Sequence, residues 1–94
     1  MNNAFVGEWQ SEKGDSFARI VITKNVRGEL VVEAYDSSDG EVIEVSKLVT
    51  EANSIEYCTR VPSNNYRSRQ RLTVMQDGSL RLELTLIERW IRCE

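Results

Sequence analysis

The chain has 94 residues, the length of one small domain. About 40% of the residues are hydrophobic and 29% are charged, a composition typical of soluble globular proteins. No apolar run approaches the roughly 20 residues of a membrane helix, so we expect no membrane span. The first residues carry neither a basic nor an apolar stretch, so we expect no secretion signal and a cytoplasmic protein.

The net charge of −3 is unevenly distributed along the chain. Residues 1–59 carry eleven acidic and five basic side chains, whereas residues 60–94 carry four acidic and seven basic ones. An acidic protein repels nucleic acid except where a local basic patch compensates. Nucleic acid is therefore not expected as a partner outside such a patch.

Seven stretches rich in β-branched and aromatic residues alternate with turn signals at intervals of about 8–12 residues, the pattern of an all-β sandwich or barrel. They cover residues 5–9, 17–24, 29–35, 41–49, 55–61, 66–75 and 79–92. The sequence Gln76-Asp77-Gly78 is the clearest hairpin signal. Because the connections are short, neighbouring strands should pair antiparallel as a meander.

Two stretches depart from simple strand patterns. Residues 41–51 would also fit a helical stripe through Val42, Val45, Leu48 and Val49, but their β-branched content favours a strand. Residues 79–92 would exceed the usual length of a strand. Strict alternation is lost there near Leu86 and Ile87, where we expect a bend or a bulge.

Within the expected strands, apolar and polar residues alternate, which predicts a sheet with one apolar and one charged face. In the last strand, Leu80, Leu82, Leu84 and Leu86 share the apolar face. A sheet with a single buried face must curl into a barrel or be covered by a partner. We predict one all-β domain over residues 1–94, an antiparallel up-and-down meander of about seven or eight strands that forms a small barrel.

The first stretch contains Gly7-Glu8-Trp9, a G-x-W motif, followed by a short polar turn and a strand led by Phe17. In these features the chain resembles the calycins, the lipocalins and avidins, whose barrels begin with G-x-W on the first strand. The resemblance implies a lipocalin-like or avidin-like barrel with a lumen for a small apolar or amphipathic ligand. It also implies that a basic residue near the last strand, Arg89 or Arg92, packs on the tryptophan. The alternative is that Trp9 plugs a dry core, since a small barrel can be filled by its own side chains.

A ligand in the barrel would meet the residues that alternation places on the inner face. Apolar walls with a few convergent polar groups are the usual composition of a ligand pocket. The expected ligand-binding residues are Trp9, Tyr57, Tyr66, Gln70, Glu88 and Trp90. The alternative is that the polar residues mark the wet, open end of the sheet, and a slip of one residue would turn them all outward.

A basic stretch on the opposite face is the second candidate site. It comprises Arg60, Arg67, Arg69 and Arg71, with no acidic residue between Glu56 and Asp77. Such a row could bind an acidic protein or single-stranded nucleic acid, with Tyr66 stacking on a base. The alternative is cross-strand pairing with Glu56 and Glu83.

The sequence contains no histidine and no cluster of acids with metal-binding register, so we expect neither an enzyme nor a metal or cofactor site. Cys58 and Cys93 match no metal spacing and should be reduced thiols, unless export allows a disulfide. A domain this small leaves sheet edges uncovered, and pairing two copies through them would bury more surface. We therefore expect a homodimer.

Overall fold

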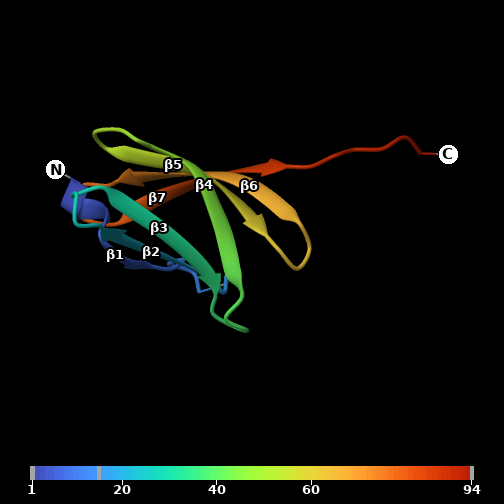
Figure 1. Ribbon diagram of the computed structural model, residues 1–94, viewed down its shortest axis with the longest axis horizontal. Helices are drawn as coiled ribbons and strands as arrows, with labels where there is room; N and C mark the ends of the chain where they lie inside the picture. Colours follow the sequence, from blue (N-terminus) through green and yellow to red (C-terminus); the bar gives the residue numbers. More distant parts are fainter. Residues whose placement is uncertain (1, 15, 94) are drawn as a thin grey trace.

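In a computed structural model that describes residues 2–14 and 16–93, the chain forms one antiparallel sheet of seven strands. The strands lie in chain order, so each pairs with its neighbours in sequence (Figure 1). Their bounds are β1 Gly7–Trp9, β2 Ala18–Lys24, β3 Leu30–Asp36, β4 Val42–Thr50, β5 Ser54–Val61, β6 Tyr66–Val74 and β7 Leu80–Ile87, preceded by the 3-10 helix η1, Asn2–Phe5. The predicted all-β meander is confirmed, and residues 42–50 form a strand rather than a helix.

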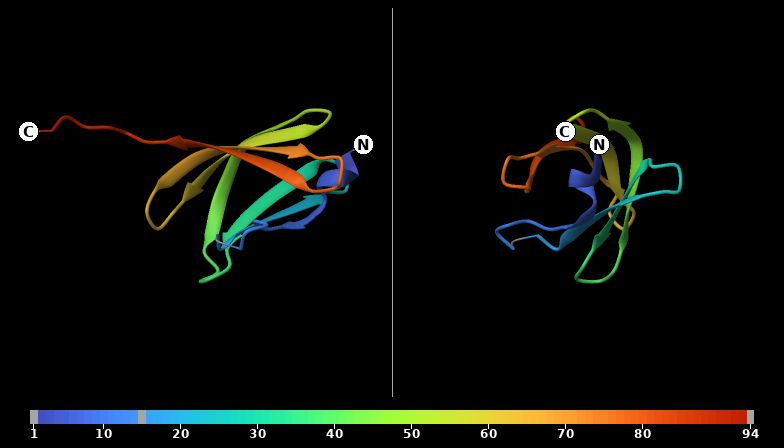
Figure 2. Two further views of the ribbon diagram at one scale, coloured as in Figure 1. Left: turned by 180° about the vertical axis from the view of Figure 1, so that it is seen from behind. Right: turned by 90° about the vertical axis from the view of Figure 1, so that its left-hand side faces the viewer.

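The sheet curls into a half-barrel whose two edges are β1 and β7 (Figure 2). The barrel predicted from the sequence is therefore open on one side. Closure would require the first and last strands to pair along their length, and β1 has just three residues.

The core lies on the concave side of the half-barrel, where alternation placed the apolar face. Ile22 lies opposite Val32, and Leu72 lies between Ile55 and Leu82, so the inner faces of successive strands are in register. The buried apolar cluster consists of Phe5, Ile22, Leu30, Val32, Ile55, Tyr57 and Leu72. The predicted division into an apolar and a charged face is thus correct.

The first expected strand begins later than predicted. Phe5 lies in η1 rather than in a strand, and its side chain is buried in the apolar core. Figure 2 shows η1 on the concave side of the curled sheet. Gly7 has a φ of 149°, which a residue with a Cβ rarely adopts, and it leads the chain from η1 into β1. The glycine of the G-x-W motif therefore serves the turn that inserts Phe5.

A β-bulge interrupts β4 rather than the last strand. Ser46 lies opposite Cys58 and Val49 lies opposite Glu56, so two residues of β4 face a single residue of β5. Lys47 occupies the bulge with a φ of 56°, and Leu48 packs against the core. The bulge expected near Leu86 and Ile87 is absent from the described strand β7, which pairs with β6 in continuous register.

Strand β7 ends at Ile87, whereas the sequence predicted a strand to residue 92. Its last pairing is with Arg67, and β6 begins one residue earlier, at Tyr66. Residues 88–93 have no neighbouring strand and leave the sheet as an extended segment (Figure 1). We call residues 88–93 the carboxy-terminal segment.

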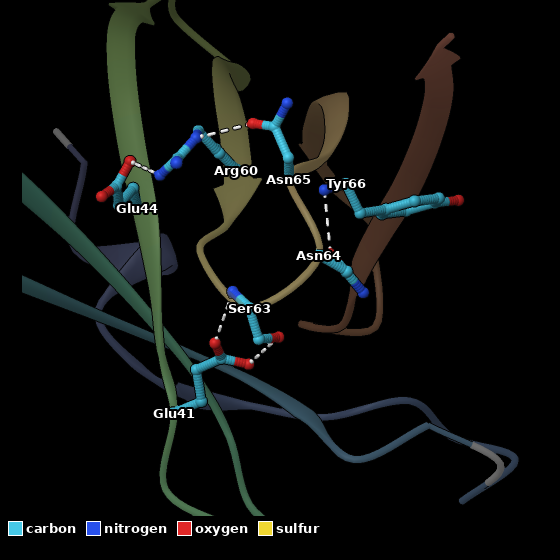
Figure 3. A network of polar contacts seen from close by, with 7 residues as sticks. All are labelled: Glu41, Glu44, Arg60, Ser63, Asn64, Asn65 and Tyr66. Atoms are coloured by element: carbon cyan, nitrogen blue, oxygen red, sulfur yellow. Dashed lines mark hydrogen bonds and ion pairs between the residues drawn. The ribbon is translucent and has the colours of Figure 1, made fainter.

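The turn after β5 is fastened to the start of β4 (Figure 3). The Glu41 carboxylate accepts hydrogen bonds from the backbone N–H and the hydroxyl of Ser63, both at 2.9 Å. Nearby, Asn64 Oδ1 accepts the N–H of Tyr66 at 2.9 Å, which starts β6. These contacts join the start of β4 to the β5–β6 turn and so stabilise the half of the sheet formed by β4, β5 and β6. By contrast, β3 and β4 share just two paired positions.

Candidate ligand-binding site

The concave face of the half-barrel contains a hollow of about 760 Å³. Its lining comes from β1 to β7 and from the loop after β1. The lining residues are Trp9, Gln10, Ser11, Glu12, Lys13, Ser16, Ala18, Ile20, Ala34, Ile43, Thr59, Gln70, Leu72, Leu80, Arg81 and Leu82. The strand residues among them, Arg81 excepted, belong to the inward-facing register, so the hollow is the interior of the half-barrel rather than a surface groove.

Trp9 stands at one wall of the hollow, where the sequence placed it. Its indole Nε1 donates a hydrogen bond to the carbonyl oxygen of Phe5 at 2.8 Å. That bond fixes the half-buried ring and joins β1 to η1. Because the polar atom of the ring is used, Trp9 offers the hollow an apolar surface.

Tyr57 and Gln70 form a polar pair across β5 and β6. The side chain of Tyr57 is fully buried, and its hydroxyl donates to Gln70 Oε1 at 2.8 Å. Burial raises the pKa of Tyr57, so the hydroxyl stays protonated and acts as the donor. The amide nitrogen of Gln70 has no hydrogen-bond partner among the described residues, and Gln70 lines the hollow. The pair therefore leaves an N–H donor for a ligand or for water.

The next positions along β5 and β6 hold a second polar pair. The hydroxyls of Thr59 and Ser68 are 2.6 Å apart, and both residues are buried. Thr59 lines the hollow beside Gln70. Neither residue was among the predicted site residues, although their inward parity follows from the same alternation as that of Tyr57 and Gln70.

The other predicted ligand-binding residues lie elsewhere. Tyr66 is exposed at the start of β6, next to the β5–β6 turn (Figure 3). Glu88 and Trp90 belong to the carboxy-terminal segment, beyond the end of β7, and the Trp90 side chain is 87% exposed. The structure thus places Trp9 and Gln70 in the lining of the hollow, with Tyr57 buried in the core and hydrogen-bonded to Gln70. Tyr66, Glu88 and Trp90 are not part of the lining.

The basic residue expected to pack on Trp9 is likewise displaced. Arg89 and Arg92 lie in the carboxy-terminal segment, which leaves the sheet at the end opposite η1 (Figure 1). The described partner of the Trp9 indole is the carbonyl of Phe5 instead. The prediction that Arg89 or Arg92 packs on Trp9 is therefore wrong.

The arginine row lies on the convex face, as alternation predicted. Arg60 pairs with Glu44 at 2.9 Å and donates from Nε to Asn65 Oδ1 at 2.8 Å (Figure 3). Arg71 pairs with Glu51 at 3.5 Å, although Glu56 and Glu83 are the residues opposite it.

The two middle positions of the row remain without counter-charges. Arg67 and Arg69 are exposed and form no ion pair with any described residue. Arg67 also lies directly opposite Arg60 on β5, which places two positive side chains side by side.

A smaller hollow of about 460 Å³ lies where β3 and β4 diverge. It is lined by residues of both faces of the sheet, such as Val32 and Ala34 from the inner face and Glu33 and Tyr35 from the outer face. This arrangement is a gap between two strands that separate after two paired positions. It carries no set of convergent polar groups comparable to Gln70 and Thr59.

In the described part of the chain, no three histidine, cysteine or acidic side chains gather closely enough to hold a metal ion. Cys58 and Cys93 are free thiols. A helix able to cross a membrane is absent from residues 2–14 and 16–93. Comparison of the chain with family models, curated proteins and solved structures finds no match in any of the three.

Proposed function

We propose that the chain is a non-enzymatic, calycin-like binding protein that holds a small, partly apolar ligand on the concave face of its half-barrel. The observation that carries the proposal is the hollow of about 760 Å³ inside the sheet, since ligand pockets commonly measure about 300–1,000 Å³. The G-x-W motif and the meander add support. The free thiols of Cys58 and Cys93 suit a reducing compartment, so we place this role in the cytoplasm.

The lining defines the chemistry of the ligand. Ile20, Ile43 and Leu72 offer apolar walls, and Trp9 adds an aromatic surface. The free N–H of Gln70 would donate to an oxygen of the ligand at a fixed place on that wall. A ligand with an apolar body and one oxygen acceptor, such as a carboxylic acid or a ketone, fits this arrangement.

The test uses 1-anilinonaphthalene-8-sulfonate, which has aromatic rings and acceptor oxygens, as a fluorescent probe. Ala18 is exposed and lines the hollow, so Ala18→Trp should fill the site without disturbing the core. The matched control is Val26→Trp, which adds the same ring at a fully exposed turn. We expect the control to bind the probe like the unmodified chain and Ala18→Trp to bind it at least about tenfold more weakly.

Equal binding by both variants would place the probe elsewhere and refute the site. Native mass spectrometry of untagged protein, purified without denaturant, complements this test. A mass excess that is lost on denaturation would report a ligand retained from the cell. Its absence from the Ala18→Trp protein, with retention in Val26→Trp, would assign it to the hollow.

The unpaired Arg67 and Arg69 favour a second candidate function, an interaction module for an acidic partner on the convex face. Its test is the binding of a single-stranded oligodeoxythymidine at several salt concentrations. Arg67→Glu with Arg69→Glu should abolish salt-dependent binding. Lys13→Glu with Arg27→Glu, which changes the charge equally at exposed positions elsewhere, should preserve it. Binding that ignores salt, or that both pairs of changes weaken alike, would exclude the row as the site.

A further inference from the structure

Strand β7 is an unprotected edge. It presents eight residues along one side of the sheet, with no described strand beside that side. Its inward-facing Leu82, Leu84 and Leu86 are 49%, 52% and 47% exposed, because the half-barrel does not close over them. An exposed edge strand with an apolar face is a surface on which another strand adds readily.

The carboxy-terminal segment follows β7 directly in an extended conformation but has no described strand to pair with. In register, the inner-face positions after Leu86 are residues 88, 90 and 92, so Trp90 falls on the leucine face of a continued strand. Trp90 and Ile91 are 87% and 79% exposed. Residues 80–92 therefore offer one long extended stretch, of which β6 pairs with residues 80–87 alone.

We propose that a second copy of the chain covers this edge, with the two β7 strands antiparallel about a twofold axis at Leu86. Residues 80–92 of one copy then pair with residues 92–80 of the other. Each carboxy-terminal segment lies beside the first half of β7 in the second copy. It thereby supplies an eighth strand to that copy's half-barrel.

Charge and apolar matching select this register among the symmetric ones. With the axis at Leu86, Glu83 faces Arg89 of the second copy and Leu82 faces Trp90, and symmetry makes each pair twice. Three unlike pairs accompany them, namely Leu84 with Glu88, Arg81 with Ile91 and Leu80 with Arg92.

The neighbouring registers are poorer matches. An axis at Thr85 sets Arg81 against Arg89, and an axis at Glu83 or Glu88 sets a glutamate against itself. An axis at Leu84 leaves Trp90 opposite the β6–β7 turn. An axis at Ile87 sets Glu83 opposite Ile91 and Arg89 opposite Thr85, so no acidic residue faces a basic one. Registers that place the axis between two residues join the leucine face of one copy to the charged face of the other.

The first test is the mass of the full chain by light scattering and native mass spectrometry. We expect a dimer of twice 10.8 kDa that dissociates on dilution. A monomer at every concentration up to the millimolar range would overturn the proposal. A dimer would then be tested by exchanging the charges of the paired residues.

Glu83→Arg and Arg89→Glu should each weaken the dimer by roughly tenfold or more, because each replaces two attractions with two repulsions. The combined variant, with both changes, should restore the affinity. Glu33→Arg on β3 is the matched control and should leave the affinity unchanged. Residue 89 is unpaired in the described chain, so circular dichroism should show that Arg89→Glu remains folded. A dimer that neither single change weakens, or that the combined variant does not restore, would refute the register.

Cross-linking tests the position of the axis independently. In a background with Cys58→Ser and Cys93→Ser, Leu86→Cys places two thiols opposite each other at the axis, where paired Cβ atoms lie about 4.5–5.5 Å apart. Leu84→Cys is the matched control, since its two copies would be four residues out of register. Oxidised glutathione should produce a covalent dimer of the Leu86→Cys protein and none of the Leu84→Cys protein. Preferential cross-linking through Leu84→Cys, or none through either, would contradict an axis at Leu86.

Discussion

The hydroxyl of Tyr57 depends on Gln70 for its hydrogen bond. The side chain of Tyr57 is fully buried, and its described hydrogen bond runs to the side-chain oxygen of Gln70. Removing the hydroxyl in Tyr57→Phe loses one hydrogen bond and should lower the free energy of unfolding by about 1 kcal/mol. Removing the acceptor in Gln70→Met leaves the hydroxyl without a partner and should cost about 1–3 kcal/mol. Urea unfolding of both variants and of the combined one measures the coupling.

The combined variant should be less destabilised than the sum of the two single changes, since neither group is then left unpaired. Tyr66→Phe is the control, because the exposed hydroxyl of Tyr66 has no described hydrogen bond. It should leave the stability within about 0.5 kcal/mol. Additive losses would mean that the Tyr57 hydroxyl reaches water in the hollow instead of relying on Gln70.

Alternation along a strand explains which site residues could be predicted. A period of two places Trp9, Tyr57 and Gln70 on the inner face without reference to the rest of the fold. The same parity assigns Glu88 and Trp90 to that face, but parity does not reveal where a strand ends. Their position depends on the length of β6, which determines where β7 loses its neighbour.

The turn between β6 and β7 couples the stability of this hairpin to pH. Hydrogen bonds from the hydroxyl and the backbone N–H of Ser79 hold the pKa of Asp77 below its ordinary value of 3.8. A carboxyl group with a lowered pKa in the folded state stabilises the protein at pH above 3.8 and loses this effect as the pH falls through its folded pKa. The unmodified chain should therefore exceed Asp77→Asn in stability at neutral pH.

The difference between these two proteins should vanish as the pH falls below the folded-state pKa of Asp77, where both side chains are neutral. Asparagine retains the acceptor oxygen, so the comparison isolates the charge. Ser79→Ala removes the hydroxyl donor and should reduce the pH dependence of the difference. Thermal unfolding at several pH values provides the measurement, and a difference that does not change with pH would contradict the assignment to Asp77.

The bulge in β4 reverses the usual preferences of a strand at one position. Lys47 has a φ of 56°, a conformation that glycine adopts readily and that β-branched residues resist. Lys47→Gly should raise the free energy of unfolding by up to about 1 kcal/mol, and Lys47→Val should lower it by about 1 kcal/mol or more. In a regular strand, the order of these two variants would be the opposite. Chemical denaturation of both variants, with Lys47→Ala as reference, distinguishes the two cases.

The same bulge explains why residues 41–51 resembled a helix as well as a strand. Val45 and Leu48 are three residues apart, yet both pack against the core, because the bulge absorbs one residue between them. Pure alternation would turn one of them outward. The strands themselves could be predicted from their own residues, whereas the bulge depends on the fit of β4 to β5, which a single stretch of sequence does not contain.

The open side of the half-barrel could not be predicted from the alternation within the strands either. Four alternating leucines in β7 predict a buried face, and the register confirms that they point inward. Burial, however, depends on the strand that would lie across the opening, and β1 is too short to fill that place. Phe5 illustrates the same point, since the residue expected at the start of a strand instead fills the concave face from η1.

Substitution of two inner-face leucines, one buried and one exposed, tests whether the half-barrel remains open in solution. Leu72 of β6 is 2% exposed and Leu84 of β7 is 52% exposed, although both belong to the inner face. Leu72→Ala should lower the free energy of unfolding by about 2–5 kcal/mol, because it leaves a cavity in the core. Leu84→Ala should cost about 1 kcal/mol in the monomer, since half of its surface already meets water. Urea unfolding at a concentration where light scattering reports the monomer would compare the free energies of unfolding of the two variants. Equal losses of that free energy would mean that β7 is covered within one chain.

At concentrations where two copies associate, the cost of Leu84→Ala should grow while that of Leu72→Ala stays constant, because association covers β7 and adds nothing to the core around Leu72.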